Sequence, residues 1–287
     1  MKTIKALSLA PAVRNWLENP QHPRILHVFE QACNLIDERG EILSIVIPQI
    51  GDGPFNLVVE NNIWFSKHLN VEFPIHRAGP AVSHRRARGT NGVEAPIFHT
   101  QLHLGDLTID TMKAKLWNPR PNWEKLHARR DQILDQLLSL SLPDHQLSIP
   151  NKLASNLASA LTGADISSAK TIASQLSGLG IGLTPTGDDF IMGAVYAVWI
   201  IHPIKIANVL AREVADTAAP LTTSLSAAWL RSAGNGEAGI LWHQFFDALV
   251  TGEEVEFHIA KILAIGETSG ADALSGFFGV CSAFKNV

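Results

Sequence analysis

The sequence predicts an α+β protein in which an N-terminal, β-rich and barrel-like domain is followed by an all-α-helical domain. Up to about residue 120, short apolar runs rich in branched residues are separated by turn signals, as is typical of strands. After Pro121, apolar residues recur at the helical period, and glycines or prolines separate successive segments. We therefore expect a β-rich domain at 1–120, a helix and a connection at 121–150, and an α-helical domain with glycine-rich, anion-binding loops at 151–287.

The expected strands are short and regularly spaced. Gly-Asp-Gly-Pro at 51–54 and Ala-Gly-Pro at 78–80 provide turns between them. Their clearest cores are Ile42–Ile47, Asn56–Val59, Val71–Phe73 and Leu107–Ile109. Strands of this length and spacing are typical of a small sheet that curls toward a barrel.

The helical part begins with Trp123–Leu140, where one stripe holds Leu126, Ile133, Leu134, Leu137 and Leu138. Pro143 and Pro150 then mark a connection. Further helices are expected at about 151–162, 165–177, 188–201, 204–218, 221–233, 237–251, 253–265 and 270–284. Several of these segments are apolar on more than one face, so some helices must be central.

Composition narrows the class of protein. Of the 287 residues, 46% are hydrophobic and 17% are charged, which supports a sizeable core and argues against disorder. The net charge of -4 gives no reason to expect nucleic acid or an anionic membrane as a partner. Cys33 and Cys281 lie in apolar surroundings and suit a reducing compartment, and the apolar run Phe190–Ile201 is too short to span a bilayer. We expect a cytoplasmic protein.

The strongest local feature is the glycine-rich loop at 178–189, which ends where an apolar helix begins. Glycines at 178, 180 and 182 free the backbone from ordinary steric limits. Thr186 is expected to be the N-cap, with Asp189 completing a capping box. Free N–H groups of this first turn, together with the hydroxyls of Thr184 and Thr186, would form a site for a small anion.

A second loop repeats this plan. Thr186-Gly-Asp-Asp-x-x-x-Gly193 matches Ser269-Gly-Ala-Asp-x-x-x-Gly276, and both patterns stand at the start of an apolar helix. The glycine one turn beyond each aspartate would let another backbone approach closely. We therefore expect the two helices to pack with their starts adjacent, so that two positive dipole ends face one pocket. The alternative is that both motifs serve only capping and packing. No lysine follows the glycines, which excludes a P-loop.

These loops supply the candidate site residues. Asp188 has no counterpart in the second loop, which makes it the better candidate for contact with substrate or metal. We assign candidate catalytic roles to Thr186, Asp188 and Asp189. Candidate substrate-binding residues are Gly180, Gly182, Thr184, Gly187, Glu267, Thr268, Ser269, Gly270, Asp272, Thr222 and Thr223. For the last two, capping of a helix is the favoured interpretation, and extra donors to the pocket are the alternative.

Other polar clusters give weaker signals. His99 and His103 have the spacing of a helical metal pair but lie in a β-like region, so we expect no zinc site. We assign no cofactor; Mg²⁺ held by Asp188 and Asp189 is an alternative, although adjacent aspartates on a helix point in different directions. A solvated loop or a subunit contact is favoured for the basic cluster Arg77, His84, Arg85, Arg86 and Arg88, over a role in binding a carboxylate or phosphate.

The loop sequence GLGIGLTPTGDDFIMG at 178–193, followed by GETSGADALSG at 266–276, resembles the signature of the AllH family. Supporting similarity lies in HVFEQACNL at 27–35 and AKLWNP at 114–119, so the resemblance spans most of the chain. The sequence departs from the family pattern at Ile181, where proline is common, and at Glu267, where histidine is common.

The resemblance implies a subunit of oxamate carbamoyltransferase, which converts oxalurate and phosphate to oxamate and carbamoyl phosphate in anaerobic allantoin and purine breakdown. It also implies partner subunits resembling the FdrA and AllG families. All four compounds are small anions, which suits the loops. On this basis 180–187 would cradle one anion, Asp188 would orient the carbamoyl NH₂ or a metal, and 268–270 would bind the other end. A non-catalytic assembly subunit and a small-anion sensor remain alternatives.

Overall fold

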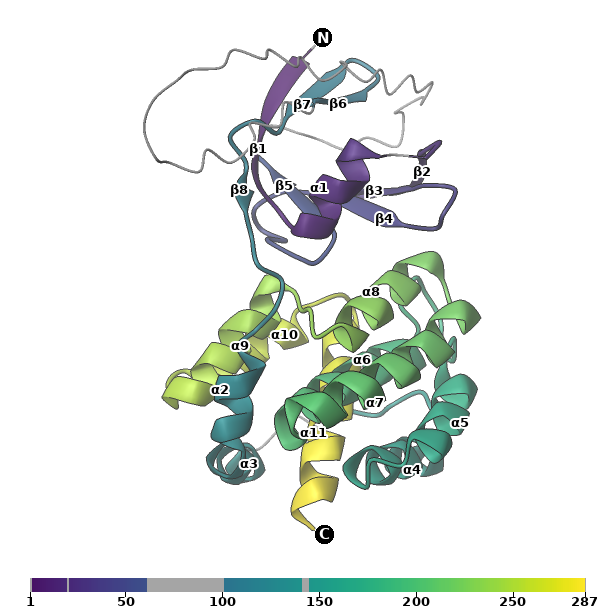
Figure 1. Ribbon diagram of the computed structural model, residues 1–287, viewed down its shortest axis with the longest axis vertical. Helices are drawn as coiled ribbons and strands as arrows, with labels where there is room; N and C mark the ends of the chain where they lie inside the picture. The colour runs from purple at the N-terminus through teal and green to yellow at the C-terminus, as the bar shows by residue number, and fades with distance from the viewer. Residues whose placement is uncertain (1, 20, 61–100, 141–144, 287) are drawn as a thin grey trace, which may run out of the picture. The chain divides into compact units, whose positions relative to one another are not determined.

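A sheet and a bundle of helices make up the chain, and they form separate units. The computed structural model describes residues 2–19, 21–60, 101–140 and 145–286 (Figure 1). The chain divides into compact units at Met1–Asn118 and Pro119–Val287. The first unit is a curled half-barrel sheet and the second is helical, which confirms the predicted fold class. The expected strand Val71–Phe73, His99 and the basic cluster lie outside the described residues.

The sheet of the first unit is organised around one long strand. Its order is β2-β3-β4-β5-β1-β7-β6, and β8 also pairs with β1. The first half of β1 runs parallel to β7, its second half pairs antiparallel with β5, and the register shifts between Ala6 and Ser8. A shift of this kind bends a strand and lets a sheet curl. The strands are β1 Lys2–Leu9, β2 Arg24–Val28, β3 Ala32–Ile36, β4 Ile42–Val46, β5 Asn56–Val59, β6 Gln101–Leu104, β7 Leu107–Asp110 and β8 Lys115–Leu116.

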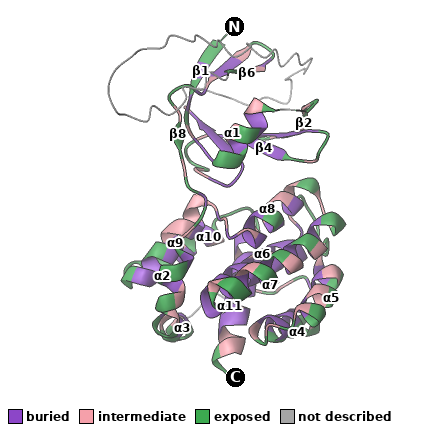
Figure 2. Cartoon of the chain, in the orientation of Figure 1, coloured by how far each residue is buried: buried purple, intermediate pink, exposed green. Residues whose placement is uncertain are grey.

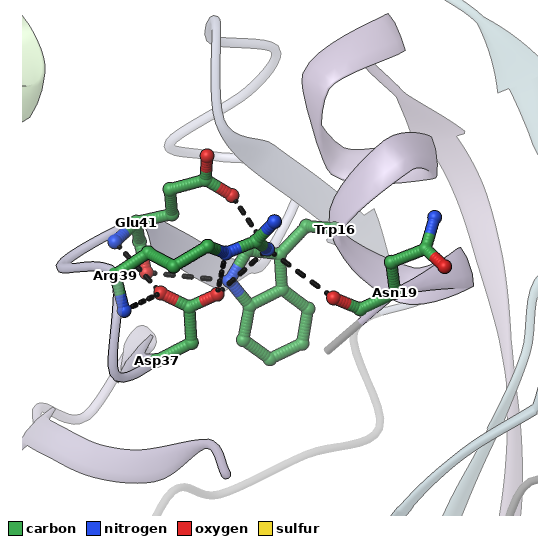
Figure 3. Close-up of polar contacts among 5 residues, drawn as sticks. All are labelled: Trp16, Asn19, Asp37, Arg39 and Glu41. Carbon is green, nitrogen blue, oxygen red and sulfur yellow. Dashed lines mark hydrogen bonds and ion pairs between the residues drawn. The ribbon is translucent and has the colours of Figure 1, made fainter. Parts of the chain in front are cut away.

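Helix α1 (Pro11–Glu18) is fastened to the turn between β3 and β4 (Figure 3). The buried Asp37 carboxylate accepts hydrogen bonds from the backbone N–H groups of Arg39 and Glu41, both at 3.0 Å. The guanidinium of Arg39 contacts that carboxylate at 2.8 Å and donates to the Asn19 carbonyl at the end of α1. Trp16 on α1 donates to the Glu41 carbonyl. Because these polar groups bond to one another, we interpret the cluster as structural.

The second unit contains helices close to those expected. They are α2 Trp123–Ala128, α3 Arg130–Ser139, α4 Asn151–Thr162, α5 Ile166–Leu176, α6 Thr186–Ile201, α7 Ile204–Ala218, α8 Ser224–Gly234, α9 Ile240–Thr251, α10 Val255–Leu263 and α11 Ser269–Lys285, with a 3₁₀ turn η1 at Ala219–Leu221. The expected first helix is split at Arg129, so that prediction was wrong in its continuity. Leu138 is exposed, because its neighbour Leu137 takes the inward position.

Helices α6 and α11 form the centre of this unit. Every residue of α6 except Met192 is buried (Figure 2). A Cβ atom added at Gly193 would lie 1.7 Å from the Ala273 carbonyl oxygen, and one added at Gly276 would lie 2.0 Å from the Phe190 carbonyl oxygen. The two backbones therefore touch directly. This confirms the expectation that the glycines beyond the aspartates let these helices pack together.

The apolar character of these helices does not extend to a membrane span. Within the described ranges, no helix combines the length and the apolar content needed to cross a bilayer.

Cys33 in the sheet and Cys281 in α11 are both buried and free. Burial raises the pKa of the Cys33 thiol to about 12, and it also raises the pKa of Cys281. Both side chains therefore behave as small apolar groups in their cores.

Two glycines of α11 test the backbone contact. Gly276→Ala should lower the free energy of unfolding by about 3 kcal/mol, because the new methyl group forces the helices apart. Gly279→Ala is the matched control: a Cβ at Gly279 meets nothing within 4 Å, so the helix preference of alanine should raise stability by about 0.5–1 kcal/mol. Urea unfolding measures both. Equal effects of the two substitutions would contradict the contact.

Candidate functional site

The glycine-rich loop between α5 and α6 is held by a short series of backbone contacts. The Leu176 carbonyl, at the end of α5, accepts from Leu179 N at 3.0 Å, and the Leu179 carbonyl accepts from Gly187 N at 2.9 Å. A Cβ atom at Gly187 would lie 1.9 Å from the Leu176 carbonyl oxygen. Only glycine fits there, because α6 begins directly against the end of α5.

The loop between α10 and α11 repeats the same contacts. The Ile262 carbonyl accepts from Ile265 N at 2.9 Å, and the Ile265 carbonyl accepts from Gly270 N at 3.1 Å. A Cβ atom at Gly270 would lie 1.8 Å from the Ile262 carbonyl oxygen. The matching sequence motifs therefore correspond to a structural repeat. In each copy, a glycine is needed because a carbonyl oxygen lies where a side chain would be.

The starts of α6 and α11 meet through side-chain hydroxyls. Thr184 Oγ1, just before α6, lies 2.8 Å from Ser269 Oγ, the first residue of α11. Thr186 Oγ1 lies 2.7 Å from Ser148 Oγ, which precedes α4. The expected adjacency of the helix starts is thus confirmed as geometry.

The predicted capping box is wrong. Pro185 is the N-cap of α6 and Thr268 is the N-cap of α11, and neither makes a side-chain capping bond. Because Pro185 is the N-cap, the cap lies one residue earlier than expected and α6 begins at Thr186. Thr186 and Ser269 are consequently inside their helices, and their hydroxyls bond across to other segments instead of capping.

Asp188 lies at the centre of a hydrogen-bonded cluster and is only 2% exposed. Its carboxylate accepts from the backbone N–H of Gly178 at 3.0 Å, from Ser226 Oγ at 3.0 Å and from Thr222 Oγ1. Ser177 Oγ lies 3.1 Å from the same carboxylate. These bonds tie the glycine-rich loop to α8. Direct contact of Asp188 with substrate or metal, as the sequence suggests, would require it to give up one of these donors.

Asp189 and Asp272 occupy equivalent positions in the two repeats. They are 5% and 1% exposed, and the Oδ2 atom of each is buried without a hydrogen-bond partner among the described residues. Burial raises the pKa of Asp189 to about 8; hydrogen bonds from Ser269 and Thr184 oppose this shift, and the charge of Asp272 adds to it. Asp189 is therefore largely protonated and neutral at pH 7.

Residues 178–183 of the glycine-rich loop are exposed. Gly178, Gly180 and Gly182 have positive φ angles of 74°, 117° and 94°, and the residues between them do not. Positive φ angles at alternate residues are a backbone conformation that glycine adopts without strain. Within the described part of the chain, the N–H groups of residues 180–184 find no acceptor. They are available to a ligand.

Two family models match this sequence. One is described as oxamate carbamoyltransferase subunit AllH and matches residues 176–281, the segment that contains both glycine loops. The other is the AllH family N-terminal domain and matches residues 5–88. The chain belongs to the AllH family. The family description is that of a subunit of oxamate carbamoyltransferase. No solved structure matches the chain.

Thr222 and Thr223 of this AllH chain have separate tasks. Thr223 accepts from Ser226 N at 3.1 Å, which confirms its expected capping of α8, and it donates to the Leu183 carbonyl at 2.6 Å. Thr222 instead bonds to Asp188. Both residues therefore position the glycine-rich loop of the AllH chain. In the second loop, Glu267 and Thr268 are exposed.

Four contributors to the AllH site were not predicted. They are Ser177, Ser226, Ser148 and His145. Ser177 and Ser226 contact Asp188. Ser148 contacts Thr186, and His145, in the same connection as Ser148, contacts Asp272. Each comes from a segment without a motif of its own. Only Ser177 could have been suspected from the sequence, because it directly precedes the glycine-rich loop.

Metal binding has little support in the described ranges of the AllH chain. They contain no group of three or more His, Cys, Asp or Glu side chains arranged to hold a metal ion. His103 Nδ1 lies 3.0 Å from Thr108 Oγ1 in the sheet. Asp188, which with Asp189 was the alternative site for Mg²⁺, is surrounded by donors instead of by other oxygen acceptors.

The adjacent aspartates of the AllH chain should respond in opposite ways to the same substitution. Asp188→Asn should lower the free energy of unfolding at pH 8 by about 3 kcal/mol, because an amide NH₂ would face hydrogen-bond donors. Asp189→Asn should raise it, because the buried carboxyl no longer has to ionise. Chemical unfolding at several pH values measures both.

The sign of the pH effect follows from the raised pKa of Asp189. The pKa of Asp189 is about 4 in the unfolded chain and about 8 in the folded one, so between these pH values the folded state holds one more proton. The contribution of Asp189 to stability therefore falls as pH rises. Asparagine does not titrate. The stability advantage of Asp189→Asn should thus grow from pH 5 to pH 8, with a slope of at most about 1.4 kcal/mol per pH unit. A constant difference across that range would contradict the neutral carboxyl.

Proposed function

We propose that this chain serves oxamate carbamoyltransferase as the subunit that holds a small anion between two helix starts. The observation that carries the proposal is the 2.8 Å contact between Thr184 Oγ1 and Ser269 Oγ, which joins the two glycine loops. Two adjacent helix N-termini supply partial positive charge, and the N–H groups of residues 180–184 have no acceptor among the described residues. Oxalurate, oxamate, phosphate and carbamoyl phosphate are all small anions and match this chemistry.

The charges around the loops support an anion. A first-turn carboxylate would repel such a ligand, but Asp189 is largely neutral at pH 7. Asp188 is turned into its own cluster of donors, and Asp272 contacts a histidine. The N–H groups of residues 180–184 in the first loop have no acceptor among the described residues. Of the three aspartates in these helix starts, one is therefore largely neutral and the other two contact groups within the protein.

The loops fit a division of labour in carbamoyl transfer. A phosphate oxygen attacks the ureido carbonyl carbon of oxalurate, and the bond from that carbon to the oxamate nitrogen breaks. We assign stabilisation of the charge on the carbonyl and phosphate oxygens to 180–187, since preorganised donors lower such barriers. We assign the carboxylate end of oxalurate to 268–270. Holding both anions together supplies much of the rate, because they repel each other in water.

A non-catalytic assembly subunit is the second candidate, and one observation favours it. Apolar side chains stand exposed around the loops: Leu179, Ile181, Leu183, Leu221 and Ile265, with Ile181 95% exposed. Exposed apolar groups in one region are typical of surfaces that bind other proteins. The same side chains suit the FdrA-like and AllG-like partners that we propose for a complex acting in allantoin breakdown in the cytoplasm. Partner binding and anion binding are compatible.

Binding of phosphate and oxamate tests the proposal. Thr184→Val removes a hydroxyl next to the free N–H groups and should weaken both ligands about tenfold or more, the cost of a hydrogen bond to a charged group. Thr171→Val is the matched control: its hydroxyl bonds to the Ser167 carbonyl on the surface of α5 and should leave affinity unchanged. Isothermal titration of each ligand against the purified chain measures the constants.

The outcomes separate the two candidates. Anion binding to the wild-type chain that weakens only in Thr184→Val supports the substrate-binding role. If neither phosphate nor oxamate binds, while the chain still assembles with its partners, the assembly role replaces it.

A further inference from the structure

The connection between α3 and α4 contacts both helix starts of the site. His145 Nε2 lies 2.7 Å from Asp272 Oδ1 in the first turn of α11. Three residues later, Ser148 Oγ lies 2.7 Å from Thr186 Oγ1 in the first turn of α6. A histidine is thus placed at the junction of the two repeats by a segment outside either glycine loop.

Asp272 is suited to orient this histidine. Its carboxyl is almost fully buried, and its other oxygen has no hydrogen-bond partner among the described residues. When Nε2–H of a neutral imidazole donates to a carboxylate, the lone pair is on Nδ1 and can accept a proton. The side chain of His145 is 23% exposed. The Nε2 edge of the imidazole is therefore held by a buried acceptor, while part of the ring remains accessible to solvent.

Among the described side chains at the two helix starts, His145 combines a basic nitrogen with partial exposure. Asp188 on α6 is occupied by its donors, and Asp189 is only 5% exposed. Glu267 in the second loop is exposed. Carbamoyl transfer needs a proton carrier, because the attacking phosphate must lose a proton and the leaving oxamate nitrogen must gain one.

We propose that His145 carries this proton and that Asp272 is its positioning residue; the inference rests on the function proposed above. Nδ1 accepts the proton of HPO₄²⁻ as the phosphate oxygen forms its bond to the ureido carbon. The imidazolium returns the proton to the nitrogen as the carbon–nitrogen bond breaks. Carbamoyl phosphate and oxamate leave, and the histidine is neutral again, so that proton and charge balance over the cycle.

Two variants separate proton transfer from structural support. His145→Gln keeps an N–H donor for Asp272 but has no basic nitrogen. His145→Gly opens a space next to Asp272 that free imidazole can enter. The matched control is His127→Gln: His127 Nδ1 lies 2.8 Å from the Ile200 carbonyl at the far end of α6, away from either loop.

The experiment uses the complex formed with the partner subunits, and carbamoyl phosphate formation from oxalurate and phosphate is measured. His145→Gln should lower kcat by about 10²- to 10⁴-fold and change KM for phosphate by less than about threefold. Imidazole should restore part of the activity of His145→Gly, and His127→Gln should match the wild type. A purely structural histidine would show no rescue by imidazole.

The failures are distinguishable. An active wild-type complex with unchanged kcat in His145→Gln, or with no rescue of His145→Gly, overturns the role of His145 and leaves the function of the subunit intact. A wild-type complex that forms no carbamoyl phosphate, built from a chain that binds neither phosphate nor oxamate, overturns the function and this inference together.

Discussion

The direct backbone contact between α6 and α11 is the constraint on which the rest of the helical unit depends. It requires Gly193 and Gly276, because any side chain at either position would occupy the space of a carbonyl oxygen on the partner helix. The contact fixes the two helices closely enough for Thr184 and Ser269 to share a hydrogen bond. Without it the loops would be two ordinary helix starts, each open to water.

The repeat is equal in its backbone but unequal in its side chains. Gly187 and Gly270 meet the same kind of carbonyl, and Asp189 and Asp272 occupy the same turn. Asp188, however, is matched by Ala271. The extra carboxylate of the first loop organises donors from α8 and holds the longer glycine segment open. The two loops therefore share a backbone arrangement, and the differences at single positions set the first loop apart as the proposed anion site.

The sequence was informative where structure depends on local rules. The glycine spacing predicted the helix starts and their close packing, because each glycine replaces a side chain that could not fit. The capping box failed because Pro185 took the N-cap position and freed the Thr186 hydroxyl for Ser148. His145 and Ser226 were beyond prediction: their roles arise from distant segments brought together by tertiary packing. No local sequence pattern predicts these long-range contacts.

The central claim is that both loops bind one anion together, and backbone amide chemical shifts report this directly. Phosphate added to the ¹⁵N-labelled chain should shift the amide resonances of residues 180–184 and 268–270 with a single dissociation constant, because the two sets face one ligand. Shifts in only one of the loops, two different dissociation constants, or changes confined to other parts of the molecule would contradict the shared site.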